Sequence, residues 1–198
     1  MKFVIATNNQ KKLAELSRIL QPLGVEAYTA AQLGFALEDV EETGSTFAEN
    51  AFLKADAACR LTGLPAIADD SGLCVDALNG EPGVFSARYA GEGATDDEKI
   101  ALLLKNLQDV PPQNRTAHFA CAVACVFPNG EVITAFGQCN GNIAFAKTGN
   151  GGFGYDPVFM LGENSFAQLS AEEKDKLSHR GNALRQFKAK LQDYLDKT

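Results

Sequence analysis

An apolar run that stops abruptly at two adjacent carboxylates is the feature that most constrains how this chain can fold. Residues 64–68 are apolar, and Asp69, Asp70, Ser71 and Gly72 follow them directly. Short apolar runs closed by turn residues are typical of buried strands, so we expect a strand with both carboxylates at its end. Two neighbouring carboxylates repel each other and stay ionised only beside a cation or strong donors. The pattern fits a magnesium site, and it fits a solvated turn equally well.

The composition is that of an ordinary globular protein. The chain has 198 residues, of which 45% are hydrophobic and 22% are charged, enough for a substantial core. Its net charge of -7 argues against nucleic acid as a partner. No apolar run reaches the length of about 18 residues that a membrane span needs, so no membrane partner is expected. The chain opens without a cationic stretch followed by an apolar segment, which predicts a cytoplasmic location.

The five cysteines are expected to be small buried side chains in a reducing compartment. Their number is odd and none forms a CxxC pair; they are Cys59, Cys74, Cys121, Cys125 and Cys139. Cys121 and Cys125 lie four positions apart in a predicted strand, so both should face the same side. Only two histidines are present, which argues against a zinc site built on histidines.

Hydrophobic patterns predict several strands. Short β-rich runs at residues 2–6 and 25–29 flank a helix predicted at residues 11–21, where apolar residues recur at helical spacing. Two longer runs at residues 116–127 and 131–139 are separated only by Pro-Asn-Gly. A turn of this kind between two β-rich runs predicts a hairpin.

Three capping boxes predict further helices. Each consists of a serine or threonine followed three positions later by glutamate, at Thr46, Thr95 and Ser170. The first of these helices should run to Thr62 and end at Gly63, because glycine readily adopts the conformation that closes a helix. A last amphipathic helix is predicted from its apolar face, which consists of Leu184, Phe187, Leu191 and Tyr194.

The polar loop at residues 7–9 connects the first strand to the first helix. Such a loop presents backbone N–H groups at a helix N-terminus, which is a natural anion site. Lys11 and Lys12 lie at the start of that helix, where the helix dipole disfavours cations. Either an anion lies beside them or both side chains point to solvent. Asn50 and Lys54, four positions apart on the next helix, present the same choice between a phosphate contact and simple exposure.

A glycine-rich segment at residues 147–157 is a candidate ligand-binding loop. Consecutive backbone N–H groups in such loops form anion-binding nests, and glycine lets a ligand approach the backbone closely. The spacing matches neither the P-loop nor the dinucleotide fingerprint. Phe153 and Tyr155 lie among the glycines, and a flat ring beside exposed backbone suits a base or a sugar.

Taken in order, six blocks resemble the inosine triphosphate pyrophosphatase family, whose members hydrolyse dITP, ITP and XTP to the monophosphate and pyrophosphate. The resemblance runs through nearly the whole chain and implies one catalytic domain of residues 1–198. It implies an α/β fold with an elongated mixed β-sheet and flanking helices, in two lobes around a central cleft, and a homodimer. Asn8 departs from the pattern, since relatives often have glycine there. The blocks are residues 6–12, 44–51, 68–73, 83–91, 151–157 and 178–181.

The resemblance also implies roles for individual residues. Asp70 resembles the proton acceptor and a ligand of Mg²⁺, and Asp69 is expected to help it orient the attacking water. A second metal ligand is expected from Glu41 or Glu42, with Glu41 favoured. Asn9 and Lys12 resemble the principal contacts of the triphosphate-binding loop. The expected substrate contacts are Thr7, Asn8, Asn9, Gln10, Lys11, Lys12, Ser71, Phe153, Gly154, Tyr155, Asp156, Lys174, His179 and Arg180.

Base choice follows from hydrogen bonding. Backbone N–H groups and Arg180 are donors, so they suit the 6-keto group of hypoxanthine and xanthine and would leave the amino group of adenine unpaired. Guanine shares the keto group, and the sequence does not show what rejects it. Two rival functions remain open at this stage, a metal-dependent phosphomonoesterase and a nucleotide sensor without turnover. A serine hydrolase using Ser71 or Ser178 is disfavoured because no GxSxG motif is present.

Overall fold

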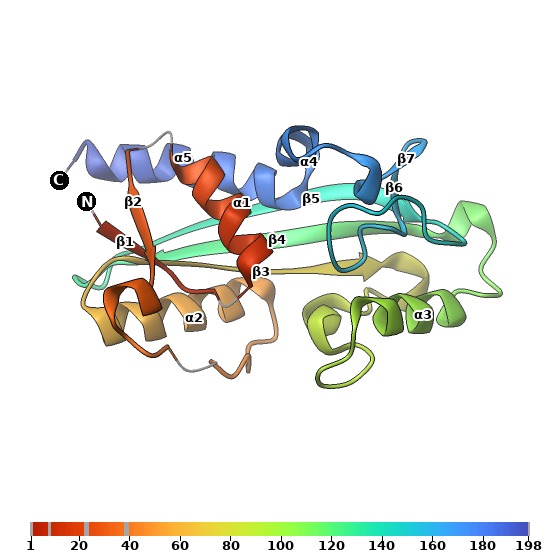
Figure 1. Cartoon of the computed structure of the whole chain (residues 1–198), viewed down its shortest axis with the longest axis horizontal. Helices are drawn as coiled ribbons and strands as arrows, with labels where there is room; N and C mark the ends of the chain where they lie inside the picture. Colours follow the sequence, from red (N-terminus) through yellow and green to blue (C-terminus); the bar gives the residue numbers. More distant parts are fainter. Residues whose placement is uncertain (1, 8, 22–23, 38–39, 198) are drawn as a thin grey trace. The chain divides into compact units, whose positions relative to one another are not determined.

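A mixed β-sheet organises the computed structural model of the chain, which describes residues 2–7, 9–21, 24–37 and 40–197 (Figure 1). Within these residues the sheet has seven strands in the order β2-β1-β3-β4-β5-β6-β7. β1 pairs in parallel with β2 and β3, whereas β5, β6 and β7 pair antiparallel. The α/β class and the mixed sheet are thereby confirmed. The strands are β1 Lys2–Ile5, β2 Glu26–Thr29, β3 Ala66–Val75, β4 Thr116–Val126, β5 Val132–Ile143, β6 Phe159–Leu161 and β7 Asn164–Ser165.

The predicted helices are present, and local signals set their starts. At Thr46, Thr95 and Ser170 the hydroxyl accepts from the backbone N–H three residues on, and the glutamate there reaches back to the cap. Gly63 closes its helix in the left-handed conformation, with φ of 68°. Both hydrogen bonds of each capping box are therefore formed as predicted. The helices are α1 Gln10–Leu20, α2 Phe47–Thr62, α3 Asp96–Asn106, α4 Ala171–Leu177 and α5 His179–Leu195.

Strand β3 differs from its prediction. It does not end at the acidic pair; it runs through Asp69 and Asp70 and continues to Val75, so the solvated turn is also wrong. Neighbouring β1 ends earlier, since its last residue, Ile5, pairs with Ile67. The two carboxylates therefore lie just beyond the carboxyl end of a parallel neighbour, the place where α/β sheets commonly bind ligands.

Two compact units make up the chain. Unit 1 contains residues 1–70, 121–137 and 179–198, and unit 2 contains residues 71–120 and 138–178. In unit 1, α1 and α5 cover one face of the strands and α2 covers the other (Figure 1). Unit 2 has its own core, in which α3 packs with a cluster of phenylalanine rings.

The hairpin agrees with its prediction, and four of the five cysteines are buried as expected, whereas Cys74 is half-buried. β4 and β5 are neighbours joined by a tight turn in which Phe127 N donates to Glu131 O at 2.9 Å. The second strand is longer than expected and reaches Ile143. All five cysteines are free, and Cys121 and Cys125 share one core cluster as their spacing indicated.

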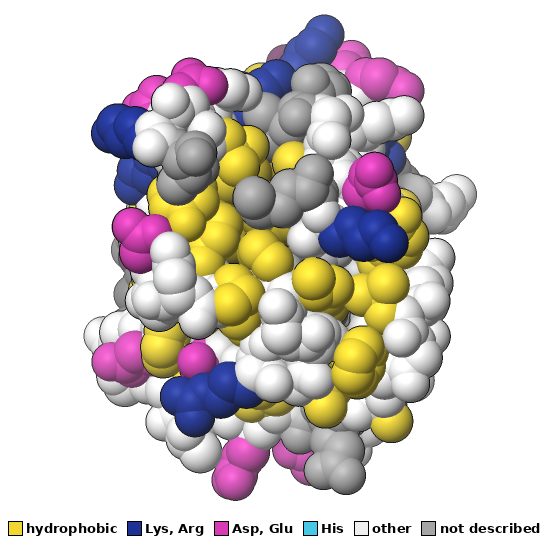
Figure 2. All heavy atoms as spheres, turned by 90° about the vertical axis from the view of Figure 1, so that its left-hand side faces the viewer, with side chains coloured by type: hydrophobic (Ala, Val, Ile, Leu, Met, Phe, Trp, Pro, Cys, Tyr) yellow, Lys and Arg dark blue, Asp and Glu magenta, His cyan; other side chains and the backbone are white. Residues whose placement is uncertain are grey.

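One face of unit 1 is apolar at its centre. Figure 2 shows the face that lies at the left of Figure 1, where hydrophobic side chains gather in the middle and charged side chains are spaced around them. Among the described helices, none is long and apolar enough to cross a membrane.

Candidate active site

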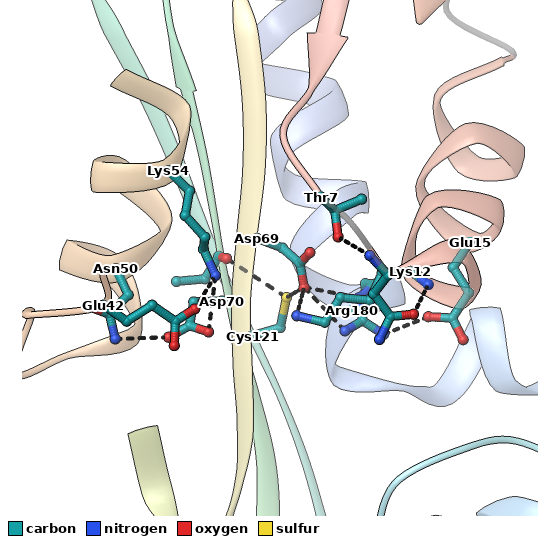
Figure 3. A network of polar contacts seen from close by, with 12 residues as sticks. Thr7, Lys12, Glu15, Glu42, Asn50, Lys54, Asp69, Asp70, Cys121 and Arg180 are labelled. Carbon is teal, nitrogen blue, oxygen red and sulfur yellow. Dashed lines mark hydrogen bonds and ion pairs between the residues drawn. The ribbon is translucent and has the colours of Figure 1, made fainter. Parts of the chain in front are cut away.

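Asp70 is the centre of a polar cluster on the α2 side of the sheet (Figure 3). Asn50 Nδ2 donates to Asp70 Oδ2 at 3.1 Å, and Lys54 Nζ lies 3.3 Å from Asp70 Oδ1. The same ammonium lies 2.7 Å from Glu42 Oε1. Asn50 and Lys54 are one helical turn apart, so both project from α2 toward β3. Simple exposure, the alternative left open for this pair, is wrong for Asn50, which is fully buried.

The environment of Asp70 favours its protonated form more than water does. Burial raises the pKa of this carboxyl above its ordinary value; Lys54 opposes the rise and Glu42 adds to it. For Lys54, nearby charges outweigh burial. Burial alone would lower the pKa of the ammonium, but the carboxylates of Asp70 and Glu42 raise it above its ordinary value. A buried carboxylate with a raised pKa is suited to accept a proton.

Asp69 points to the opposite face of the sheet, because successive side chains of a strand alternate (Figure 3). Its Oδ2 accepts from Arg180 Nε at 3.2 Å and Nη2 at 3.1 Å, and Lys12 Nζ lies 3.2 Å from the same oxygen. Arg180 Nη1 also donates to Glu15 at 2.5 Å, and Cys121 Sγ lies 3.9 Å from Asp69 Oδ2. This face of β3 therefore carries a buried ion-pair network.

Two cations decide the ionisation of Asp69. Burial alone would raise the pKa of this carboxyl, but the charges of Lys12 and Arg180 outweigh burial and hold the pKa well below its ordinary value. The same ion pair acts on Arg180. Burial alone would lower the pKa of its guanidinium, but the charge of Asp69 and the other acidic groups more than offset burial, so the pKa is raised. The expectation that Asp69 and Asp70 orient one water together is corrected here, since the two carboxylates occupy opposite faces.

The N-terminal loop is joined to this network. Asn9 N donates to Thr7 Oγ1 at 3.2 Å, and Asn9 Oδ1 accepts from Lys12 N at 3.2 Å, which satisfies a free amide at the start of α1. Lys12 points to Asp69 rather than to solvent, and an anion beside it stays a prediction. Gln10 is exposed. Asn8 lies outside the described residues, as does the side chain of Lys11.

The structure places Glu42, and not the favoured Glu41, beside Asp70, and the second metal ligand itself stays a prediction. Glu41 is exposed, whereas Glu42 shares the ammonium of Lys54 with Asp70. Within the described residues there is no cluster of three or more His, Cys, Asp or Glu that could hold a metal. Mg²⁺ commonly uses only one or two carboxylates and completes its shell with water and phosphate oxygens. A cation already lies against both oxygens in the form of Lys54, so the pair fits such an ion.

Unit 2 holds the glycine-rich loop around a buried carboxylate. Asp156 Oδ2 accepts from Phe153 N at 2.8 Å and from Lys174 Nζ at 2.7 Å. The ammonium of Lys174 lies 4.5 Å from the centroid of the Phe153 ring, a cation–π distance. A Cβ at Gly152 would lie 2.1 Å from Asp156 Oδ2, and φ there is +70°, so only glycine fits. Asp156 and Lys174 thereby connect this loop and its aromatic ring into one contact group.

Other predicted residues take supporting positions. Gly154 N donates to Asp96 Oδ2 at 2.7 Å, at the first turn of α3. Tyr155 is buried, and its hydroxyl donates to Ser86 O at 3.0 Å; burial raises the pKa of this hydroxyl. Tyr155 thus anchors the loop to the core of unit 2. Ser71 is half-buried in β3, and His179 is buried at the start of α5.

Sequence reasoning missed several members of these clusters. Glu15 contacts Arg180 and Cys121 contacts Asp69, each from another element. Asp96, which accepts from Gly154 N, follows the capping residue Thr95 and was not predicted as part of the site. Glu15 lies three positions after Lys12, and that helical spacing was the one available signal. Nothing local marks Cys121, because its partner is 52 positions away.

Carboxylates and lysines beyond the carboxyl end of a parallel strand in an α/β sheet are typical of enzymes that bind phosphate groups. The fold and the site therefore place the chain in this class as a candidate. The comparison with protein families is more specific: the model of the Ham1 family matches residues 3–190. The chain therefore belongs to the Ham1 family.

Curated relatives match over nearly their full length. A protein of Desulforamulus reducens named dITP/XTP pyrophosphatase is 50% identical over 188 residues, covering 93% of this chain and 92% of the relative. A Geobacillus kaustophilus protein of the same name is 51% identical over 185 residues, covering 92% and 90%.

Solved structures share the fold. The Ham1 protein of Staphylococcus aureus is 43% identical, with a TM-score of 0.88 over 98% of this chain and 100% of that one. A nucleoside-triphosphatase, dITP/XTP pyrophosphatase, from Mycobacterium abscessus is 48% identical, with a TM-score of 0.77 over 93% and 97%.

Proposed function

We propose that this protein hydrolyses dITP, ITP and XTP to the nucleoside monophosphate and pyrophosphate, and so removes deaminated purines from the nucleotide pool. The observation that carries the proposal is the buried carboxylate of Asp70, held by Asn50 and Lys54 beside Glu42. Membership of the Ham1 family and relatives named dITP/XTP pyrophosphatase support it. We also propose that residues 1–198 act as a single catalytic domain, since the family model spans residues 3–190.

Magnesium is the proposed cofactor, and Asp70 and Glu42 are its proposed ligands. Oxygen ligands and a nearby triphosphate are the surroundings that this ion prefers. When bound, the ion would offset the negative charge on phosphate oxygens.

The proposed reaction uses Asp70 as proton acceptor. A water molecule attacks the α-phosphorus, the new P–O bond forms, and Asp70 accepts the proton that the water releases. The bond from the α-phosphorus to the bridging oxygen breaks, and pyrophosphate leaves with that oxygen. The ammonium of Lys12 leaves Asp69, contacts the phosphate oxygens and so stabilises the negative charge of the leaving pyrophosphate. Thr7, Asn8, Asn9, Gln10 and Lys11 are proposed to bind the rest of the triphosphate through the loop and the start of α1.

The base is proposed to contact the glycine-rich loop. The ring of Phe153 offers a stacking surface beside Lys174, and Gly154, Tyr155 and Asp156 keep the loop in place. Ser71, His179 and Arg180 complete the proposed substrate contacts. Arg180 is already held by Asp69 and Glu15, so the N–H donors of its guanidinium are fixed in place before the substrate binds.

A cytoplasmic homodimer is the proposed form of the protein. The apolar centre of the face in Figure 2 supports self-association, since apolar patches ringed by polar side chains often bind other proteins. Size-exclusion chromatography with light scattering tests this: a mass near 42 kDa, twice the chain mass of 21.1 kDa, is expected, and a monomer would contradict it.

Product analysis tests the reaction. The purified protein is incubated with ITP and magnesium, with GTP and ATP in parallel, and the products are separated. IMP and pyrophosphate from ITP, with little product from ATP or GTP, are expected. Inosine diphosphate with inorganic phosphate would place the attack at the γ-phosphorus and contradict the mechanism. Tight binding of ITP without turnover would instead favour a nucleotide sensor.

A further inference from the structure

Lys54 lies between the two proposed metal ligands. Its ammonium is 2.7 Å from Glu42 Oε1 and 3.3 Å from Asp70 Oδ1, so the two carboxylates share one cation. The side chains of Lys54, Glu42 and Asp70 are 17%, 22% and 8% exposed, so solvent screens their charges only in part. The ammonium contacts the same oxygens that a divalent ion would use.

The two carboxylates are also positioned without the help of Lys54. Asn50 donates to Asp70 Oδ2, and its own Oδ1 accepts from Gly44 N at 2.8 Å. Gly44 follows Glu42 by two positions, so Asn50 connects the segment that carries one carboxylate to the strand that carries the other. A Cβ at Gly44 would lie 2.6 Å from Asn50 Oδ1, so this close approach requires glycine. Removing the ammonium should therefore leave both carboxylates in place.

From this geometry we infer that Lys54 competes with the metal ion for Glu42 and Asp70, and thereby keeps the metal affinity of the nucleotide-free protein low. The inference rests on the metal site proposed above. An ammonium and a divalent ion repel each other strongly at contact distance in a partly buried site, so they exclude one another from the same oxygens. In this account the ammonium of Lys54 occupies the oxygens of both carboxylates in the free protein and withdraws when the metal binds.

Manganese binding without nucleotide tests the competition directly. Mn²⁺ serves as the probe, and the free ion is counted by electron paramagnetic resonance for the wild-type protein and for Lys54→Met. The variant is expected to bind Mn²⁺ roughly tenfold more tightly, because one cation–cation repulsion is removed. Lys54→Arg, which keeps the charge, is expected to stay within about twofold of the wild-type protein for the same reason.

Two controls separate this effect from others. Lys190→Met removes an exposed ammonium of α5 that donates to Thr134 O at 2.7 Å, and it should leave Mn²⁺ affinity unchanged. Glu42→Gln, alone and combined with Lys54→Met, should weaken binding and so identify the site. Thermal unfolding checks that each variant is folded, and Lys54→Gln replaces Lys54→Met if the latter is not.

The outcomes are distinct for the two proposals. Tighter binding by Lys54→Met that depends on Glu42 supports the competition. Unchanged or weaker binding by both neutral Lys54 variants, with the wild-type site still dependent on Glu42, overturns the competition and leaves the metal site standing. Binding that does not depend on Glu42 in any protein overturns the metal site and the competition with it.

Discussion

The two faces of β3 place the same side chain in opposite electrostatic settings. Asp69 and Asp70 are adjacent and both buried, yet the pKa of Asp69 is lowered and that of Asp70 is raised. In both, burial is the largest influence and disfavours the charge. Lys12 and Arg180 overcome it for Asp69, whereas Asp70 shares the ammonium of Lys54 with a second acid, Glu42. Burial alone therefore does not set the direction of the pKa shift of these two carboxyls; the charged groups beside each of them decide it.

The proposed function gives the chemistry to Asp70, and the ion-pair network of Asp69 suggests a structural role for its neighbour. The variant Asp70→Asn is the strongest test of this difference. We expect turnover of ITP to fall by roughly a thousandfold, because an amide cannot accept the proton from the attacking water. Binding of ITP, measured by calorimetry, should be retained. Turnover close to that of the wild-type protein would remove Asp70 from this role.

Asp69→Asn should act on stability instead. The substitution leaves the buried guanidinium of Arg180 without its main countercharge, and breaking a buried pair in this way costs about 3–5 kcal/mol. Urea unfolding measures the loss of unfolding free energy. Asp70→Asn is the matched control: its raised pKa means that ionisation of Asp70 disfavours folding at neutral pH, so the neutral amide should not destabilise the protein. Equal losses in both variants would contradict the comparison.

Acid should separate the two carboxyls further. The pKa of Asp69 is lower in the folded than in the unfolded chain, so its stabilisation is complete above the unfolded value of about 3.9 and is lost as the pH falls through the folded value. The pKa of Asp70 is raised, so protonating it as the pH falls removes a destabilising charge. Urea midpoints measured from neutral pH downward should therefore fall less steeply below about pH 4 for Asp69→Asn than for the wild-type protein. Parallel curves would refute this.

A smaller effect is expected in unit 2. Asp96 accepts from Gly154 N, whereas its neighbour Asp97 pairs with Lys147. Loss of one such hydrogen bond is worth about 0.5–1.5 kcal/mol, so Asp96→Ala should raise the KM for ITP by roughly two- to tenfold and change kcat little. Asp97→Ala removes an equivalent charge from the same helical turn and should leave KM unchanged. Identical kinetics for the two variants would exclude loop positioning by Asp96.

Several features of the fold followed from the sequence alone. The capping box at Thr46 and the glycine at Gly63 predicted where α2 begins and about where it ends, and the Pro-Asn-Gly turn predicted the β4–β5 hairpin. These signals are local: the groups that form each hydrogen bond lie within about four positions of one another. These helix ends and this turn therefore depend only on nearby residues. The family could likewise be recognised from six short blocks of sequence, without knowledge of how distant segments pack.

The surroundings of the two carboxylates were decided only by the tertiary structure. The sequence placed Asp69 and Asp70 at the end of a strand, as one acidic pair. Packing continued β3 past them and so turned them to opposite faces, where Arg180 meets Asp69 from 111 positions away. The same packing brought Glu42 rather than Glu41 to Lys54, 12 positions apart. Charge partners of this kind depend on which elements meet on each face of the sheet, and only the folded chain sets those distances.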